Sequence, residues 1–112
     1  MSAQIASIEI KALRSTGESF PVQFSVGAPY RNSESDLEEW RCPVSLQPLY
    51  SRLAHAAGAD SMQALCMALS LGVDLLGKFV EDGGRLFHPD GTEFLLQSFA
   101  FGHAARQAGN AA

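Results

Sequence analysis

The stretch that decides the fold is residues 60–84, DSMQALCMALSLGVDLLGKFVEDGG. Asp60 is placed to accept hydrogen bonds from the first backbone N–H groups of a helix, and Gln63, three residues later, can reach back to complete a capping box. A Gly-Gly pair at the end of the stretch supplies a typical helix stop. The sequence therefore predicts a helix over residues 61–81.

This predicted helix is apolar over most of its circumference, so it has to be covered on more than one side. Its charged pair Asp74 and Lys78 interrupts the segment too strongly for comfortable insertion in a bilayer, and we expect no membrane role. The polar positions fall on one narrow stripe, consisting of Gln63, Ser70, Asp74 and Lys78. The expected core-facing stripe consists of Leu65, Ala68, Leu69, Gly72, Leu76 and Phe79. A second apolar stripe consists of Met62, Cys66, Val73 and Val80.

Two segments before this helix alternate with the period of half-buried strands. Residues 5–13 place Ala6, Ile8, Ile10 and Ala12 on one face. Residues 19–26 place Phe20, Val22, Phe24 and Val26 on one face. A Ser-Thr-Gly turn separates the two segments, so the sequence predicts a β-hairpin.

A third strand is predicted over residues 38–46, where the inward positions are Trp40, Cys42, Val44 and Leu46. Trp40 is expected to pack in the core rather than to stack on a ligand. Pro43 cannot donate to a strand ladder, so this strand is expected at a sheet edge. The same argument applies more weakly to Pro21.

The rest of the chain predicts one more helix and a second hairpin. Pro48 is expected to open a short helix through about residue 57, which Gly58 ends. Beyond the long helix, residues 85–88 predict a strand, Pro-Asp-Gly-Thr predicts a turn, and residues 93–101 predict the returning strand. The Ala-rich residues 103–112 are expected to form a flexible tail.

These elements predict the α+β class: an antiparallel β-meander packed on one long apolar helix, with a C-terminal β-hairpin, in one domain over residues 1–102. A chain of 112 residues that is 46% hydrophobic can bury a core without a metal or a disulfide. Cys42 and Cys66 lack metal-ligand spacing, and the first residues lack the pattern of a secretion signal. We therefore expect free thiols and a cytoplasmic location.

One pair of short patches resembles a family of small uncharacterised bacterial domains, described as a domain of unknown function. The first patch is Trp40-x-Cys42 on a strand, and the second is the helix start G-x-D-S-x-Q-A-L over residues 58–65. The likeness covers roughly residues 5–90. It implies a bacterial origin and a β-meander followed by a long helix, and it brings no activity and no catalytic residues.

Residues with catalytic or metal-binding chemistry are scattered. His88, Asp90 and Glu93 are metal-ligand types within one short segment, but Pro-Asp-Gly is what a tight turn needs in any case. The pair Asp60-Ser61 is accounted for by helix capping. His55, His88 and His103 are isolated in sequence, so only the fold can assemble a catalytic base. We expect no metal, no cofactor and no catalytic activity.

The net charge is −4, from eight Lys and Arg against twelve Asp and Glu. Without a basic cluster, nucleic-acid binding is not expected. One loop carries four carboxylates that are suited to a basic protein partner, although a merely solvated loop is the alternative. They are Glu34, Asp36, Glu38 and Glu39.

The function that these features favour is non-catalytic protein binding, for example as an immunity-type inhibitor of a bacterial toxin or as an accessory subunit. The alternative is a ligand-binding or enzymatic domain whose site, built around one of the three histidines, exists only in the fold. Because one small sheet covers one side of the apolar helix, and two-fold assemblies are the commonest oligomers, we also expect a homodimer. The alternative is that the C-terminal hairpin covers the second side of the helix within one chain.

Overall fold

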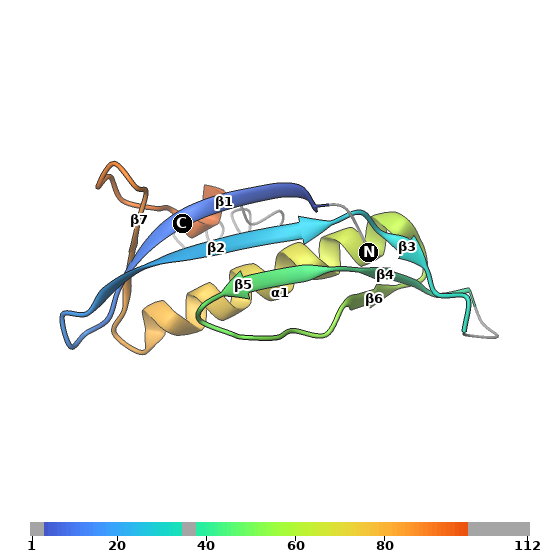
Figure 1. Cartoon of the computed structure of the whole chain (residues 1–112), viewed down its shortest axis with the longest axis horizontal. Coiled ribbons are helices and arrows are strands. Elements are labelled where there is room, and N and C mark those ends of the chain that lie inside the picture. The colour runs from blue at the N-terminus through green and yellow to red at the C-terminus, as the bar shows by residue number, and fades with distance from the viewer. Residues whose placement is uncertain (1–3, 35–37, 99–112) are drawn as a thin grey trace, which may run out of the picture.

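Helix α1, Ser61–Glu81, runs along one face of two antiparallel sheets (Figure 1). The computed structural model describes residues 4–34 and 38–98. Over these residues the protein is α+β, with one sheet in the order β5-β2-β1-β7 and the other in the order β3-β4-β6. The strands are β1 (Gln4–Leu13), β2 (Ser19–Gly27), β3 (Tyr30–Arg31), β4 (Trp40–Cys42), β5 (Val44–Gln47), β6 (Ala56–Gly58) and β7 (Arg85–Phe87), and a 3-10 turn, η1 (Leu96–Ser98), follows.

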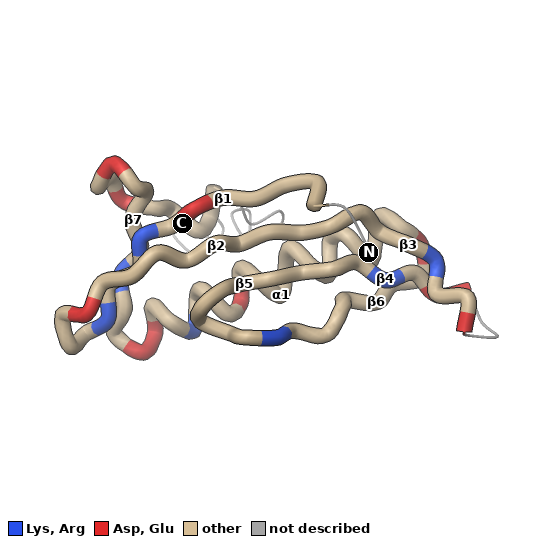
Figure 2. The backbone as a smooth tube through the Cα atoms, in the orientation of Figure 1, with Lys and Arg blue, Asp and Glu red and all other residues tan. Residues whose placement is uncertain are grey.

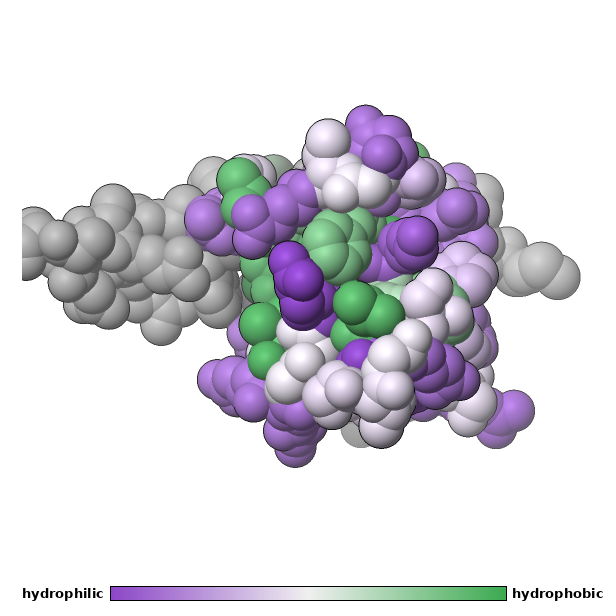
Figure 3. Space-filling model, turned by 90° about the vertical axis from the view of Figure 1, so that its left-hand side faces the viewer, coloured by the Kyte–Doolittle hydropathy of each residue, from purple (hydrophilic) through white to green (hydrophobic). Residues whose placement is uncertain are grey.

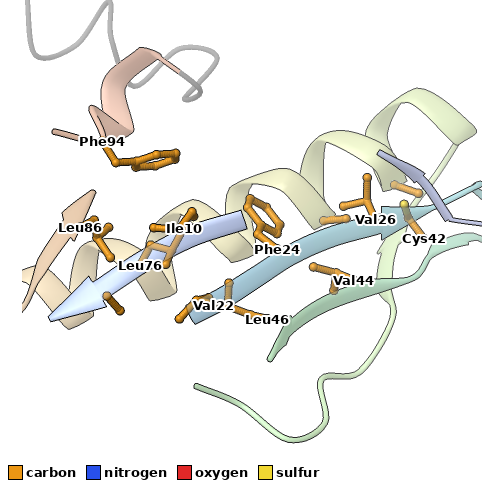
Figure 4. Packing of buried hydrophobic residues seen from close by; sticks show 13 residues of the cluster. Ile10, Val22, Phe24, Val26, Cys42, Val44, Leu46, Leu76, Leu86 and Phe94 are labelled. Atoms are coloured by element: carbon orange, nitrogen blue, oxygen red, sulfur yellow. The ribbon is translucent and has the colours of Figure 1, made fainter. Parts of the chain in front are cut away.

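The predicted first hairpin is confirmed. Strands β1 and β2 pair in antiparallel register, and the inward positions that the alternation predicts carry the core, with Ile10, Ala12 and Val22 fully buried. Apolar side chains from both strands point toward α1 (Figure 4). The turn closes with a hydrogen bond from Arg14 N to Glu18 O of 2.8 Å, and Gly17 adopts the positive φ of +96° that the turn requires.

The predicted third strand is split in two at Pro43. Its first part, β4, joins the second sheet, and its second part, β5, forms an edge of the first sheet. Pro43 lacks an N–H group and contributes only its carbonyl, which accepts a hydrogen bond from Gly27 N of 3.0 Å. The predicted inward-facing positions are confirmed, because Cys42 is buried and Trp40 is half-buried against the core.

Proline also occurs in β2, which is an inner strand and not an edge. Pro21 lies opposite Lys11 of β1, and β5 pairs with β2 only from Gln23 onward. The nitrogen of Pro21 therefore falls beyond the end of β5, where no ladder bond is lost.

The predicted short helix over residues 48–57 is wrong. Residues 48–55 form an irregular connection, and Ala56–Gly58 is strand β6, paired with β4. At the start of this segment the Ser51 carbonyl accepts a hydrogen bond from the Gln47 side chain, with an Nε2–O distance of 2.7 Å. Gly58 does not end a helix. A Cβ atom there would overlap the backbone at the start of α1, so glycine permits the close approach of β6 to this helix.

The long helix and its N-terminal cap are confirmed. Gln63 N donates to Asp60 Oδ1 at 2.7 Å, and Gln63 Oε1 accepts from Ala59 N at 2.6 Å. The predicted faces are only partly correct, because the core-facing stripe is rotated toward Ala64 and Val73. Leu69, which was assigned to the core, is 37% exposed. The buried residues of α1 are Ala64, Ala68, Gly72, Val73 and Leu76.

By length and composition α1 also qualifies as a candidate membrane span, which is weak evidence because core helices pass the same test. Its close contacts with the sheets are those of a core helix. At Gly72 the helix lies so close to β2 that a Cβ atom there would overlap the ring of Phe24.

The C-terminal hairpin is shorter than predicted. The predicted strand is present as β7, but its return consists of one bridge between Phe87 and Glu93, followed by η1. Phe94 is buried beside Ile10 and Leu86 in the core (Figure 4). The last part of the predicted returning strand and the predicted tail, residues 103–112, lie outside the described residues.

Candidate protein-binding site

Strand β1 has two neighbours at one end and one neighbour at the other. Strand β2 pairs with β1 between Gln4 and Leu13, with a register shift between Gln4 and Ala6, whereas β7 pairs only with Lys11–Leu13. Within the described residues, the stretch Gln4–Ile10 therefore has a ladder partner on one side alone. We call this stretch the open edge.

The hairpin turn fixes which backbone groups point out of the open edge. Arg14 and Glu18 form a hydrogen-bonded pair, and in an antiparallel ladder such pairs recur at every second residue. From Ala6 to Ala12 the even-numbered residues of β1 therefore direct their N–H and C=O groups toward β2, and the odd-numbered residues direct theirs away from it. The register shift between Gln4 and Ala6 ends this alternation. On the open edge, the backbone groups of Ser7 and Glu9 consequently point toward an incoming strand.

An apolar groove of about 330 Å³ lies between the open edge and α1. Strand β1 contributes Ile8, the helix contributes Leu69 and Val73, and the C-terminal segment contributes Phe94 and Leu96. Unsatisfied apolar surface continues on both sides, because Ile5 is 53% exposed and Leu69 is 37% exposed. A backbone edge beside an apolar groove is the arrangement that recognises extended peptide strands.

Figure 2 shows charged residues at the two ends of the molecule and also on β1, on α1 and in the connection between β5 and β6. None of the residues that line the groove is charged. At the end that carries the β1–β2 turn, small hydrophobic areas are interrupted by hydrophilic side chains (Figure 3). The aromatic pair Phe20 and Phe79 lies at this end under the guanidinium of Arg14, 4.7 Å from the Phe20 ring centroid. Polar side chains thus cover this end, in contrast to the groove.

The acidic run does not act as one uniform surface. Glu34 and Glu38 are exposed, whereas Glu39 is half-buried and its Oε2 accepts from Asn32 Nδ2 at 2.8 Å and from Arg41 Nε at 2.7 Å. Asn32 and Arg41 hold the pKa of Glu39 below its ordinary value. Asp36 lies outside the described residues. The exposed carboxylates Glu34 and Glu38 therefore lie in the same part of the molecule as Arg41, near β3 and β4.

The ring of His55 is hydrogen-bonded to another side chain. Its Nδ1 is hydrogen-bonded to Tyr30 Oη at 2.6 Å. It lines a shallow pocket of about 280 Å³ together with Ser25 and Ser45, on the face of the sheet away from α1. The hydrogen bond that fixes the imidazole goes to Tyr30, so neither serine is shown paired with it as an activated nucleophile.

The other candidates from the sequence are accounted for by local structure. Asp90 Oδ1 accepts from Thr92 Oγ1 at 2.6 Å and from Thr92 N at 2.9 Å, and these bonds lower the pKa of Asp90. His88 packs against the Phe94 ring at a centroid distance of 5.1 Å. In the part of the chain that the structure describes, no group of three metal-ligand side chains occurs. His103 lies outside that part.

Both cysteines are free thiols. Cys42 is buried, its Sγ donates to Gly27 O at 3.3 Å, and burial raises its pKa, which makes it an unreactive core residue. Cys66 is half-buried on α1.

The open edge is the feature that sequence reasoning missed. The alternation of residues 5–13 predicts a strand but not how many neighbours it has. The second apolar stripe of α1 was a partial signal, because Met62 is 69% exposed and Val80 is 42% exposed. The short spacing between the stop of α1 and the Pro-Asp-Gly turn was a second signal, since it limits β7 to three residues.

Comparison with known proteins gives one match. No curated protein and no solved structure matches the chain. A protein-family profile described as a domain of unknown function (DUF6968) matches residues 9–93, which include most of both sheets and all of α1. That span is well over half of the chain, and the chain therefore belongs to this family of domains of unknown function.

Proposed function

We propose that the chain is a non-catalytic protein-binding domain that contacts its partner along the open edge and the groove beside it. The observation that supports this most directly is the coincidence of the outward backbone groups of Ser7 and Glu9 with an uncharged apolar groove. A strand added there gains ladder hydrogen bonds, and its alternate side chains enter the groove. An immunity-type inhibitor or an accessory subunit is the kind of protein that works in this way.

The acidic run is proposed as a steering surface rather than as the main contact. Exposed carboxylates raise the association rate of a basic partner and contribute little to stability. Neutralising all four, Glu34, Asp36, Glu38 and Glu39, is expected to slow association and to flatten its dependence on salt. An association rate that ignores both the substitutions and the salt would remove this part of the proposal.

A second candidate function is supported by the Tyr30–His55 pair, which lies on the opposite face of the first sheet from α1. It would make the shallow pocket a small-molecule or catalytic site. The two candidates share Gln4 and Val26 but otherwise use different residues, so substitutions at His55 and Leu69 can separate them.

The test compares matched variants of the tagged full-length chain for recovery of a bound protein from extracts of its own cells. Ser7→Pro removes an outward N–H group, and Leu69→Glu places a charge in the groove. We expect both to reduce recovery at least tenfold, on the order of 1.4 kcal/mol of binding free energy. Met67→Glu, at a helix position that is 46% exposed and does not line the groove, is the matched control.

His55→Ala decides between the two candidates. Under the proposed function, recovery stays at the level of the unchanged chain. If recovery is lost with His55→Ala and retained with Leu69→Glu, the pocket rather than the open edge is the functional site.

A further inference from the structure

We propose that the groove beside the open edge is occupied by residues 99–101 of the same chain, and that a partner enters the groove by displacing them. We call this stretch the Phe-Ala-Phe segment; it lies outside the described residues, and only its sequence enters the argument. The inference rests on the proposed function, because it concerns the regulation of the same surface. Three observations carry it: the place where the described chain ends, the volume of the groove, and the lack of charge in both groove and segment.

The described part of the chain ends beside the groove. Phe94 is buried in the core, and Leu96, two residues later, lines the groove. The turn η1 contacts α1, and the described residues end with this turn, at Ser98. Residue 99 is therefore attached at the groove itself, without a linker to span. It also follows Leu96 by three residues, the spacing that puts side chains on the same side of a 3-10 turn.

This attachment favours the chain's own segment over any free occupant. A segment tethered directly at its site is present there at an effective concentration of about a millimolar. A second copy of the chain, or another protein, at micromolar concentration would have to bind about a thousandfold more tightly to occupy the groove equally. The tethered segment is therefore the first occupant, and a partner has to compete with it.

The volume of the groove matches the side chains of the segment. The groove measures about 330 Å³, and its walls are largely aliphatic, with Ile8, Leu69 and Val73 among them. A cavity of about 150 Å³ holds one benzene ring, so the groove has room for two phenyl side chains. The segment supplies two, Phe99 and Phe101, within three residues. The other two stretches outside the described residues, 1–3 and 35–37, each contain one large apolar side chain.

The segment and the groove also agree in charge. None of the residues that line the groove is charged. Residues 94–105 contain no Lys, Arg, Asp or Glu, and the first charged side chain after Glu93 is Arg106. No ionised carboxylate, ammonium or guanidinium group would be buried when the segment covers the groove, so the large cost of burying an unpaired charge does not arise.

The first test detects the contact in the unchanged, full-length chain. We expect NMR cross-relaxation between the ring protons of the Phe-Ala-Phe segment and the methyl groups of Leu69 and Val73. A sample that mixes isotope-labelled and unlabelled chains distinguishes contacts within one chain from contacts between two. Absence of the contacts overturns the inference. Contacts seen only between labelled and unlabelled chains overturn it as well, because the occupant is then a second copy.

The second test opens the groove by substitution and probes it with a dye-labelled synthetic peptide of residues 97–106. The full-length double variant Phe99→Ser, Phe101→Ser is expected to bind this peptide at least about tenfold more tightly than the unchanged chain, where the tethered segment competes. Fluorescence anisotropy measures the binding, and circular dichroism checks that the variant keeps its helix. Equal binding by the unchanged chain and the double variant overturns the inference.

Two further variants control this measurement. Leu95→Ser removes a large apolar side chain from the same part of the chain, at a position that is 45% exposed and does not line the groove. It is expected to bind the peptide as weakly as the unchanged chain. Adding Leu69→Glu to the double variant places a charge in the groove and is expected to abolish binding. Binding that survives Leu69→Glu would show that the peptide uses another surface, and the inference fails.

The outcomes separate this inference from the proposed function. If the contacts are present and the double variant recovers more bound protein than the unchanged chain, both stand. If the contacts are absent while Leu69→Glu still lowers recovery, the inference fails and the proposed function stands. If the contacts are present but recovery responds neither to Leu69→Glu nor to the double variant, the proposed function fails. The segment then fills the groove as part of the core, and the competition with a partner is overturned.

Discussion

The two ends of β1 share one alternating sequence pattern and differ in what covers them. Near its C-terminal end, Ile10 and Ala12 are fully buried between α1, β2 and β7. Near its N-terminal end, Ile5 is 53% exposed, and the backbone has a described partner only in β2. The difference follows from the three-residue length of β7, which is set by the Pro-Asp-Gly turn beyond it. The covered end stabilises the fold, and the open end is where we propose that a partner binds.

The largest expected effect contrasts two isoleucines of this strand. Ile10→Ala leaves a cavity in the core and is expected to lower the free energy of unfolding by about 2–5 kcal/mol. Ile5→Ala removes a side chain that is 53% exposed, and its expected effect on the monomer is within about 0.5 kcal/mol. Chemical denaturation at low protein concentration measures both. Equal losses would show that the open end is covered in solution.

Two glycines of α1 show the same contrast between a closely packed position and an open one. At Gly72 a Cβ atom would overlap the Phe24 ring, so Gly72→Ala is expected to destabilise the fold by about 1–3 kcal/mol, despite the better helix propensity of alanine. At Gly77 a Cβ atom meets nothing within 4 Å, so Gly77→Ala is expected to stabilise by up to about 1 kcal/mol. Thermal unfolding of the two variants should move in opposite directions. A stabilising Gly72→Ala would mean that α1 does not sit this close to β2.

A smaller effect is expected at the helix cap, which separates folding from association. Asp60→Ala removes the acceptor of the Gln63 N–H group and is expected to lower stability by about 0.5–2 kcal/mol. Asp60 does not line the groove, so the recovery of a bound protein should be unchanged once the protein is folded. An unchanged denaturation midpoint would exclude Asp60 as the cap. A loss of association at unchanged stability would move the binding surface to the start of α1.

Features set by local chemistry could be predicted from the sequence. The cap at Asp60, the extent of α1 and the first hairpin each depend on residues within a few positions of one another. The split at Pro43 follows from the missing N–H group that the sequence already shows, but its consequence depends on β2 ending at Gly27, close to the same point.

Features set by distant partners could not be predicted. Residues 56–58 have the composition of a helix end, yet they form β6, because they pair with β4. The residues around 56–58 give no sign of this distant pairing partner. The exposure of Leu69 likewise depends on where the second sheet and Phe94 lie around α1. The open edge is also a feature set by distant parts of the chain. Its alternation is visible in the sequence, but an uncovered side is a property of the neighbouring strand and not of the strand itself.

The smallest expected effect concerns the acidic run, whose charge contrasts with the uncharged lining of the groove beside the open edge. The bonds from Asn32 and Arg41 lower the folded-state pKa of Glu39, so their stabilisation is present at neutral pH and is lost as the pH falls through that lowered value. Glu39→Gln should therefore reduce stability at pH 7 and lose its effect in acid, while the neighbouring Glu38→Gln serves as the exposed control. NMR titration of the carboxyl carbons measures the pKa of Glu39 directly. An ordinary value would mean that these bonds do not persist, and Glu39 would rejoin the other carboxylates as a site for a basic partner. A lowered value would leave Glu34 and Glu38 as the exposed acidic groups of this run within the described residues.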